Sequence, residues 1–436
     1  MNSILDDALL SRLDQRLRRT DDLLQQSYPG DDGRRQPVHT VYVPAEKYTP
    51  GLPAAWGREA RDALEAHGGL NQLVAGVVAR QNPAASSDEA YLNRLAELVA
   101  HKLEHQPIED LRLDFEDGYG RRRDSEEDSH AVASARAVAA ALRADVAPPF
   151  IGLRFKCLEA DTRARGLRTL ELYLSTLLES AGHLPDSTVI TLPKVTTVDQ
   201  ISAMNEVVST LESGLGLKEG ALRYEVQVET PQLILGPDGA AEVARALHAG
   251  QGRISSLHYG TYDYSASLGI SAAYQSMDHP AADFAKMVMQ AAAAGTGVHL
   301  SDGSTNILPV GSDDQVHQAW ELHSGLVFRH LRRGIYQGWD MHPGHLPTRF
   351  LATFDFFLQS LEPALARLGR YLRAEAGAVM DEPATAKALA RYVLRGSACG
   401  AVDPETVAQR VGVEWSTLEH LAATGVAEPN EHKENA

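Results

Sequence analysis

Eight short apolar runs, repeated at similar intervals, constrain the fold of this sequence more than any other feature. They lie at about 38–43, 111–117, 150–156, 188–195, 223–230, 254–260, 297–303 and 334–343. Runs of this length, bounded by turn residues, are typical of strands. Most are separated by about 30–40 residues, and this is enough for one helix each. Eight such units predict an α/β fold, a (β/α)8 TIM barrel. A doubly wound open sheet is the alternative, but no glycine fingerprint follows the first run.

The segments outside the barrel are predicted to be helical. Residues 1–36 form an N-terminal helical segment with an apolar stripe of Leu5, Leu9, Leu13 and Leu17. The barrel spans residues 37–348 and carries a helical insertion at about 45–108, whose last helix we expect Ser86 or Ser87 to cap. Residues 349–436 form a C-terminal helical extension, interpreted as a lid or an oligomer contact.

The end of this extension also has the pattern of two helices joined by a turn. Asp403 is suited to cap the first helix, Pro404 to begin it, and Gly412 to form the turn. A DNA-binding role would need basic residues on the second helix, but that segment carries Glu414 and Glu419 and no Lys or Arg. We therefore favour a lid or an oligomer contact.

Composition excludes several classes of protein. The chain of 436 residues is 44% hydrophobic, so a mainly disordered chain is excluded. Its formal net charge of −17 argues against nucleic acid or an anionic membrane as a partner. Two cysteines form no disulfide framework, and acidic residues occupy the N-terminus where a signal peptide would need an apolar run. We expect a cytoplasmic protein.

Charged side chains follow most of the apolar runs. One such carboxylate is usually a loop residue or a helix cap, but in a barrel the C-terminal ends of all strands meet at one mouth. An arginine inside an apolar strand, such as Arg154, needs either an ion pair or a site, because burial without a partner is costly. The charged residues at these ends are Asp114, Glu116, Asp117, Arg154, Lys156, Lys194, Glu229, Asp263, Asp302, Asp340 and His342.

An ordered set of motifs resembles the HpcH/HpaI aldolase and citrate lyase β-subunit family, and within it the citrate lyase β-like and malyl-CoA lyase branch. The motifs are VYVPA (41–45), DFEDG (114–118), GLRFK (152–156), LPKV (192–195), VET (228–230), YGTYDYSASLG (259–269) and WDMHP (339–343). The resemblance covers about residues 38–345 in the order of the family. It implies a TIM barrel that binds a divalent metal, Mg²⁺ or Mn²⁺.

The resemblance also implies roles for individual residues. Glu229 and Asp263 match the two metal carboxylates. Arg154 matches the arginine that binds a substrate oxygen and acts in catalysis. The acidic loop of Asp114, Glu116 and Asp117 orders the surroundings of the metal, and Lys194, Gly260 and Thr261 are expected to contact the substrate. Relatives form trimers or hexamers, so a homo-oligomer is expected.

The chemistry of these residue types agrees with that reading. Mg²⁺ prefers oxygen ligands and often takes only one or two protein carboxylates, which leaves room for a chelating 2-oxo acid such as glyoxylate or pyruvate. A fixed guanidinium suits the enolate oxygen that forms when the neighbouring carbon–carbon bond breaks. For the base, Asp302, Asp340, His342 and a metal-bound water are all candidates, as is an acid from a neighbouring subunit.

The predicted function is thus a Mg²⁺-dependent carbon–carbon lyase or aldolase, with an acyl-CoA lyase favoured. Lys47, Arg121, Arg122 and Arg123 are candidates for the CoA phosphates, although the three arginines also fit a solvated turn balanced by the acids at 124–128. Departures from the family pattern, such as Thr196 and Thr197 after LPKV, keep three alternatives open. These are a CoA-independent HpaI-like aldolase, a malate-synthase-like condensation, and a barrel that binds a metabolite without turnover.

Overall fold

The computed structural model describes residues 5–373 and 382–426. Eight parallel strands form one sheet in the order β7-β6-β5-β4-β3-β2-β1-β8. A bridge between Ser301 and Gln337 links β7 to the residue before β8, so the two ends of the sheet meet. The predicted TIM barrel is confirmed, and each strand overlaps one predicted run. The strands are β1 His39–Pro44, β2 Asp110–Asp114, β3 Phe150–Arg154, β4 Thr188–Leu192, β5 Tyr224–Val228, β6 Ile254–Tyr259, β7 His299–Ser301 and β8 Gly338–Asp340.

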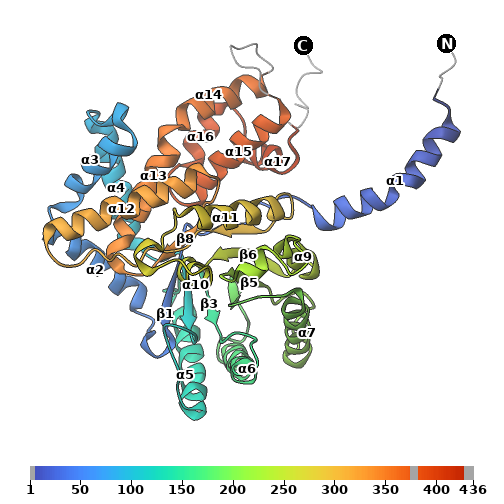
Figure 1. The fold of residues 1–436 in the computed structure, drawn as a ribbon. Coiled ribbons are helices and arrows are strands. Elements are labelled where there is room, and N and C mark those ends of the chain that lie inside the picture. Colours follow the sequence, from blue (N-terminus) through green and yellow to red (C-terminus); the bar gives the residue numbers. More distant parts are fainter. Residues whose placement is uncertain (1–4, 374–381, 427–436) are drawn as a thin grey trace.

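Helices follow the strands and cover the outside of the barrel (Figure 1). Side chains alternate along each strand. On β2, Leu111 and Leu113 belong to the hydrophobic core that includes residues of the surrounding helices, whereas Arg112 bonds to polar side chains of β4 and β5. The covering helices are α5 Asp124–Arg143, α6 Arg163–Ala181, α7 Val198–Leu215, α8 Pro231–Ile234, α9 Glu242–Ala249, α10 Thr261–Ser267, α11 Pro280–Ala293, α12 Asp313–Arg332 and α13 Leu346–Gln359.

The insertion after β1 is helical, as the sequence predicts. It comprises α2 Leu52–Ala66, α3 Gly69–Gln81 and α4 Glu89–His105, with short 3-10 turns at Ala45–Lys47 and Pro83–Ala85. The cap of α4 differs from the prediction: the side chain of Asp88, rather than Ser86 or Ser87, accepts a hydrogen bond from Tyr91 N. Asp88 is the cap because it directly precedes the first helical residue. From that position its carboxylate reaches the backbone N–H groups of the first turn, which have no partner within the helix.

The C-terminal helices share a second hydrophobic core with α2, α3, α4, α12 and α13. They are α14 Leu361–Leu372, α15 Pro383–Ala398, α16 Pro404–Val411 and α17 Trp415–Thr424. The predicted turn between the last two is present, with Asp403 accepting from Thr406 N and Gly412 in the left-handed region at φ +80°. α15 and α17 face the N-terminal ends of β1, β7 and β8 across a cavity.

Helix α1, Asp7–Ser27, extends away from the rest of the molecule (Figure 1). None of its residues is buried, and Leu10, Leu13, Leu17 and Leu24 are exposed. No helix within the described ranges is long and apolar enough to span a membrane.

Candidate functional site

The loop after β2 is organised by the carboxylate of Asp114. Its oxygens accept hydrogen bonds from Glu116 N at 3.0 Å and Gly118 N at 2.8 Å. A Cβ at position 118 would lie 2.6 Å from Asp114 Oδ2, so this close turn requires glycine. The same carboxylate receives Arg154 from β3 in two parallel bonds, each of 2.7 Å. Asp114 therefore fixes both the acidic loop and the orientation of Arg154.

Arg154 is held on every side at the C-terminal end of β3. Its Nη1 lies 3.4 Å from Glu116 Oε2 and 3.5 Å from Gln227 Oε1. Its guanidinium carbon lies 4.6 Å from the centre of the Tyr42 ring. A guanidinium held in this way loses little freedom when it binds an anionic oxygen, which suits it to stabilise developing charge.

Lys194 stands at the centre of the acidic side chains. Its Nζ lies 2.8 Å from both Glu116 Oε1 and Asp117 Oδ2, and 3.6 Å from Asp263 Oδ1. Its backbone has φ +52°, which is uncommon for a residue other than glycine, and its backbone N donates to Glu229 Oε1 at 2.8 Å. Burial opposes the charge, but Glu229 and Glu116 outweigh it and raise the pKa of Lys194.

Glu229 follows β5 and is buried, with only 2% of its surface exposed. Burial, together with Glu116 and Asp263, raises its pKa to about 7, although Lys194 acts in the opposite direction. Gly260, after β6, lies directly against it, because a Cβ there would be 2.5 Å from Glu229 Cβ. Asp263 on α10 is about half exposed at 46%. Buried and exposed carboxylates thus converge from β5 and α10.

The residues present fit a divalent metal. Burial raises the pKa of the Glu229 carboxyl, so a cation bound beside it would stabilise its ionised form. Carboxylate oxygens are the ligands that Mg²⁺ and Mn²⁺ prefer. Glu229 and Asp263 would hold the cation, with Glu116 and Asp117 at the edge of the same cluster.

The remaining predicted substrate residue, Thr261, has a structural role in this arrangement. It is buried, and its Oγ1 accepts a hydrogen bond from Ser304 N at 3.2 Å. A Cβ at Gly303 would lie 2.0 Å from that oxygen, so the loops after β6 and β7 are packed tightly together. Thr261 therefore anchors the start of α10, the helix that carries Asp263.

Two of the three candidate bases are held in buried ion pairs. Asp302 is bound by Lys286 of α11 at 2.8 and 2.9 Å. Asp340 accepts from His39 at 2.7 Å and from Arg349 of α13 at 2.9–3.1 Å. Such pairing fixes both carboxylates to their neighbours, so neither is suited to abstract a proton.

His342, the third candidate, lies half-buried in the loop after β8. Its Nδ1 accepts a hydrogen bond from Gly344 N at 3.0 Å, and burial lowers its pKa, so the ring is neutral near pH 7. Within the described residues, no hydrogen bond or ion pair joins His342, Asp302 or Asp340 to Glu229 or Asp263. The structure therefore brings the acidic loop, Arg154 and Lys194 together with Glu229 and Asp263, and leaves the candidate bases apart.

Sequence reasoning missed the polar interior beneath this site. Arg112 donates to Glu225 at 2.8 and 3.1 Å and to Thr191 at 3.1 Å. Above it, Tyr42 and Gln227 connect this layer to Arg154. The signal was present in the alternation of polar and apolar residues in LRLD and YEVQVE, because every second side chain of a strand faces the barrel axis.

The basic residues considered for CoA lie on the loops after β1 and β2. Lys47, Arg121 and Arg123 are exposed. Arg122 lies 3.4 Å from Glu46 and 3.8 Å from Glu126, and its guanidinium covers the Tyr119 ring at 5.1 Å. Arg122 is thus partly balanced by nearby acids, while the other three cations face solvent at the same end of the barrel as Arg154.

Several solved structures are similar to this chain in overall arrangement. Malate synthase of Haloferax volcanii, native at 3 mM glyoxylate, is 15% identical with a TM-score of 0.47, covering 90% of this chain and 98% of its own. CitE of Mycobacterium tuberculosis, in complex with magnesium, acetoacetate and coenzyme A, is 18% identical with a TM-score of 0.46, covering 84% and 99%. An HpcH/HpaI aldolase/citrate lyase family protein of Burkholderia cenocepacia J2315 is 13% identical with a TM-score of 0.40, covering 80% and 98%.

No curated protein matches the sequence. One family model, described as Domain of unknown function (DUF6986), matches residues 17–426. This match includes the whole barrel, the insertion and the described C-terminal helices, and the chain is therefore a member of the DUF6986 family.

Proposed function

We propose that this protein is a Mg²⁺- or Mn²⁺-dependent enzyme that makes or breaks a carbon–carbon bond beside a 2-oxo acid. One observation carries the proposal. Arg154, locked by Asp114, lies at the same end of the barrel as the Glu229 and Asp263 carboxylates, with Lys194 between them. A fixed guanidinium beside a metal-ligand pair is what enolate chemistry requires.

Each charged side chain of the proposed site has its own role. A divalent cation, when bound, supplies a Lewis acid that polarises the 2-oxo group. Glu229 and Asp263 hold that cation, and the backbone N of Lys194 fixes the Glu229 carboxylate for the purpose. The Lys194 ammonium offers a positive charge to the substrate carboxylate. Arg154 stabilises the oxygen of the enolate that forms or reacts at the neighbouring carbon.

A proton must leave the substrate hydroxyl in the cleavage direction. The candidate that we retain is an acid from a neighbouring subunit, because the one basic nitrogen of the neutral His342 ring, Nδ1, already accepts from Gly344 N at 3.0 Å. Asp302 and Asp340 do not serve here, because their ion pairs with Lys286 and Arg349 hold them in place.

Within this class we favour an acyl-CoA lyase of the citrate lyase β-like and malyl-CoA lyase type. The exposed cations Lys47, Arg121 and Arg123 follow β1 and β2 at the end of the barrel that carries Arg154, where they can bind the phosphates of CoA. A cytoplasmic homo-oligomer, a trimer or a hexamer, completes the proposal.

The binding half of the proposal is tested by calorimetry on the full chain at pH 8, where Glu229 is mostly ionised because its pKa is about 7. Mg²⁺ is titrated first, followed by glyoxylate or pyruvate. We expect metal-dependent binding of one oxo acid, which Glu229→Gln abolishes. Glu171→Gln, on the exposed face of α6, is the matched control and should bind as the wild type does. No Mg²⁺ binding, or equal binding in Glu229→Gln, would contradict the site.

The acyl partner is tested by product analysis. Acetyl-CoA and glyoxylate are incubated with the Mg²⁺-loaded enzyme, and the products are separated by mass. A new hydroxyacyl thioester supports the acyl-CoA lyase, whereas free CoA with a hydroxy acid would indicate a malate-synthase-like condensation. Aldol products from pyruvate and an aldehyde without any thioester would indicate an HpaI-like aldolase. No product in any arm, with intact metal and oxo-acid binding, would indicate a barrel that binds without turnover.

A further inference from the structure

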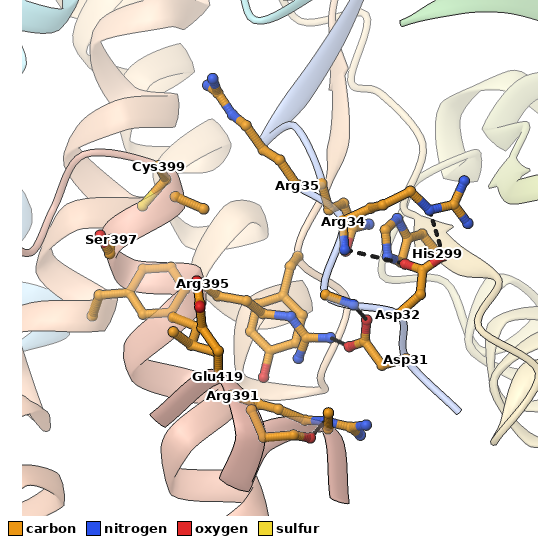
Figure 2. Close-up of a pocket in the computed structure, with 18 of the residues that line it drawn as sticks. Asp31, Asp32, Arg34, Arg35, His299, Arg391, Arg395, Ser397, Cys399 and Glu419 are labelled. Atoms are coloured by element: carbon orange, nitrogen blue, oxygen red, sulfur yellow. Dashed lines mark hydrogen bonds and ion pairs between the residues drawn. The ribbon is translucent and has the colours of Figure 1, made fainter. Parts of the chain in front are cut away.

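A cavity lies at the opposite end of the barrel from Arg154. It has a volume of about 660 Å³, within the usual range for small-molecule sites. The N-terminal ends of β1, β7 and β8 form one wall through Val38, His299 and Tyr336. Helices α15 and α17 form the other wall, and the loop at 31–36 closes one side (Figure 2). We call this space the lower cavity.

The lower cavity carries an excess of positive charge on a chain with a net charge of −17. Four guanidinium groups line it, against three carboxylates. Two of the arginines have a carboxylate partner in the lining, because Arg34 lies 2.5 Å from Asp32 and Arg395 lies 3.2 Å from Asp31 (Figure 2). Arg35 is paired outside the lining, at 2.9 Å from the buried Glu109.

Arg391 is the guanidinium without such a partner. Its Nε donates to the backbone oxygen of Ala422 at 3.0 Å, and this bond fixes its position on α15. Within residues 5–373 and 382–426, no carboxylate lies within ion-pair distance of it. A guanidinium has five N–H donors in a planar fork, so most of those on Arg391 are available to an anion.

Aromatic and aliphatic side chains supply the other part of the lining. Tyr336, Phe357, Leu394 and Trp415 all border the lower cavity. The guanidinium carbon of Arg395 lies 4.3 Å from the centre of the Tyr336 ring, which places a positive charge directly beside the apolar wall. A cavity with one arginine outside any ion pair and an aromatic wall matches a ligand that is anionic at one end and apolar at the other.

We propose that the lower cavity binds a small organic anion, a carboxylate or a phosphate carried on a ring-bearing apolar body. The anionic group pairs with Arg391, and the ring packs against Trp415 and Tyr336. This site shares no residue with the mouth of the barrel, so the inference does not depend on the activity proposed above.

The test uses the full chain with two probes, benzoate and phenyl phosphate, each followed by calorimetry. We expect saturable binding of at least one, and its identity decides between a carboxylate and a phosphate. Arg391→Gln should weaken binding about tenfold or more, because it removes a charge-assisted pair. Arg168→Gln, an exposed arginine of α6, is the matched control and should bind as the wild type does. Glu229→Gln should also retain binding, which separates this site from the mouth.

A second variant protects the test against a folding defect in Arg391→Gln. Ala423 lines the lower cavity and is exposed, so Ala423→Trp fills the space without removing a contact of Arg391. We expect it to block both probes. Failure of both probes to bind the wild type, or unchanged binding in Arg391→Gln and Ala423→Trp, would overturn the proposal. Inorganic phosphate binding as tightly as phenyl phosphate would overturn the part that requires an apolar body.

Discussion

Arg154 and Asp114 form a two-pronged ion pair across β3 and β2, with Nε–Oδ1 and Nη2–Oδ2 distances of 2.7 Å each. The two residues are in register on neighbouring strands, so the sheet itself brings them together. The pair directs the remaining nitrogen of the guanidinium, Nη1, toward Glu116 and Gln227. The chemistry proposed for the mouth depends on this fixed direction.

Replacement of Arg154 by lysine tests that dependence. Arg154→Lys keeps the positive charge but loses the planar fork, so it cannot satisfy Asp114 and an enolate oxygen together. We expect kcat to fall about 100-fold to 1,000-fold while Mg²⁺ affinity stays unchanged. Arg168→Lys on the exposed face of α6 should leave both unchanged. A variant with nearly normal kcat would remove Arg154 from the reaction.

The contact between Gly260 and Glu229 provides a second test. Gly260→Ala would place a Cβ 2.5 Å from Glu229 Cβ and 2.8 Å from its Oε2, so the carboxylate must move. We expect Mg²⁺ affinity to fall about tenfold or more and stability to fall by about 1–3 kcal/mol. Calorimetry and thermal unfolding measure the two effects.

Gly214→Ala is the control for that substitution. Gly214 lies within α7 and has open space around its Cβ position, so alanine should stabilise the protein by about 0.5–1 kcal/mol. Unchanged Mg²⁺ binding in Gly260→Ala would show that Glu229 is not a metal ligand.

A buried histidine makes stability depend on pH. Burial, aided by the nearby Arg349, lowers the pKa of His330 from 6.5 to about 3. The unfolded chain therefore binds a proton at this histidine near pH 6.5, whereas the folded chain does not. The free energy of unfolding is therefore highest above pH 6.5 and falls as the pH drops toward 3.

Denaturant unfolding at several pH values between 7 and 4 measures this effect. His330→Gln, whose amide oxygen can still accept from Arg349, should show a shallower loss of stability on acidification. His183→Gln is the control, because His183 is exposed. The same pH slope in all three proteins would contradict the buried neutral state of His330.

The N-terminal helix α1 is expected to be dispensable for folding of the barrel, because it buries none of its residues. Removal of residues 1–25 should change the thermal midpoint by less than about 2 °C. Sedimentation of the two forms then tests the leucine stripe: a smaller assembly after truncation would show that α1 joins subunits. A large drop in the midpoint without a change of assembly would contradict the independence of α1 from the barrel.

The sequence by itself determined the barrel and the strand ends that carry the site. Alternation within each strand and helical periodicity between strands are local properties, and neighbouring residues are sufficient to encode them. The sequence predicts the cap of α4 at Ser86 or Ser87, which lie two residues and one residue before the observed cap, Asp88. Several nearby residues are able to cap this helix, and only the position at which the helix begins selects Asp88.

Tertiary structure decided which charges meet. Asp302 and Asp340 resemble Glu229 and Asp263 in the sequence, since all lie at or soon after the ends of strands. Partners from distant helices, Lys286 of α11 and Arg349 of α13, form buried ion pairs with the first two. The pairing of Arg112 with Glu225, 113 residues apart, and the lower cavity between the barrel and α15 also arise only on folding. Strand pattern is local information, whereas a charge acquires its role from neighbours that the whole fold brings to it.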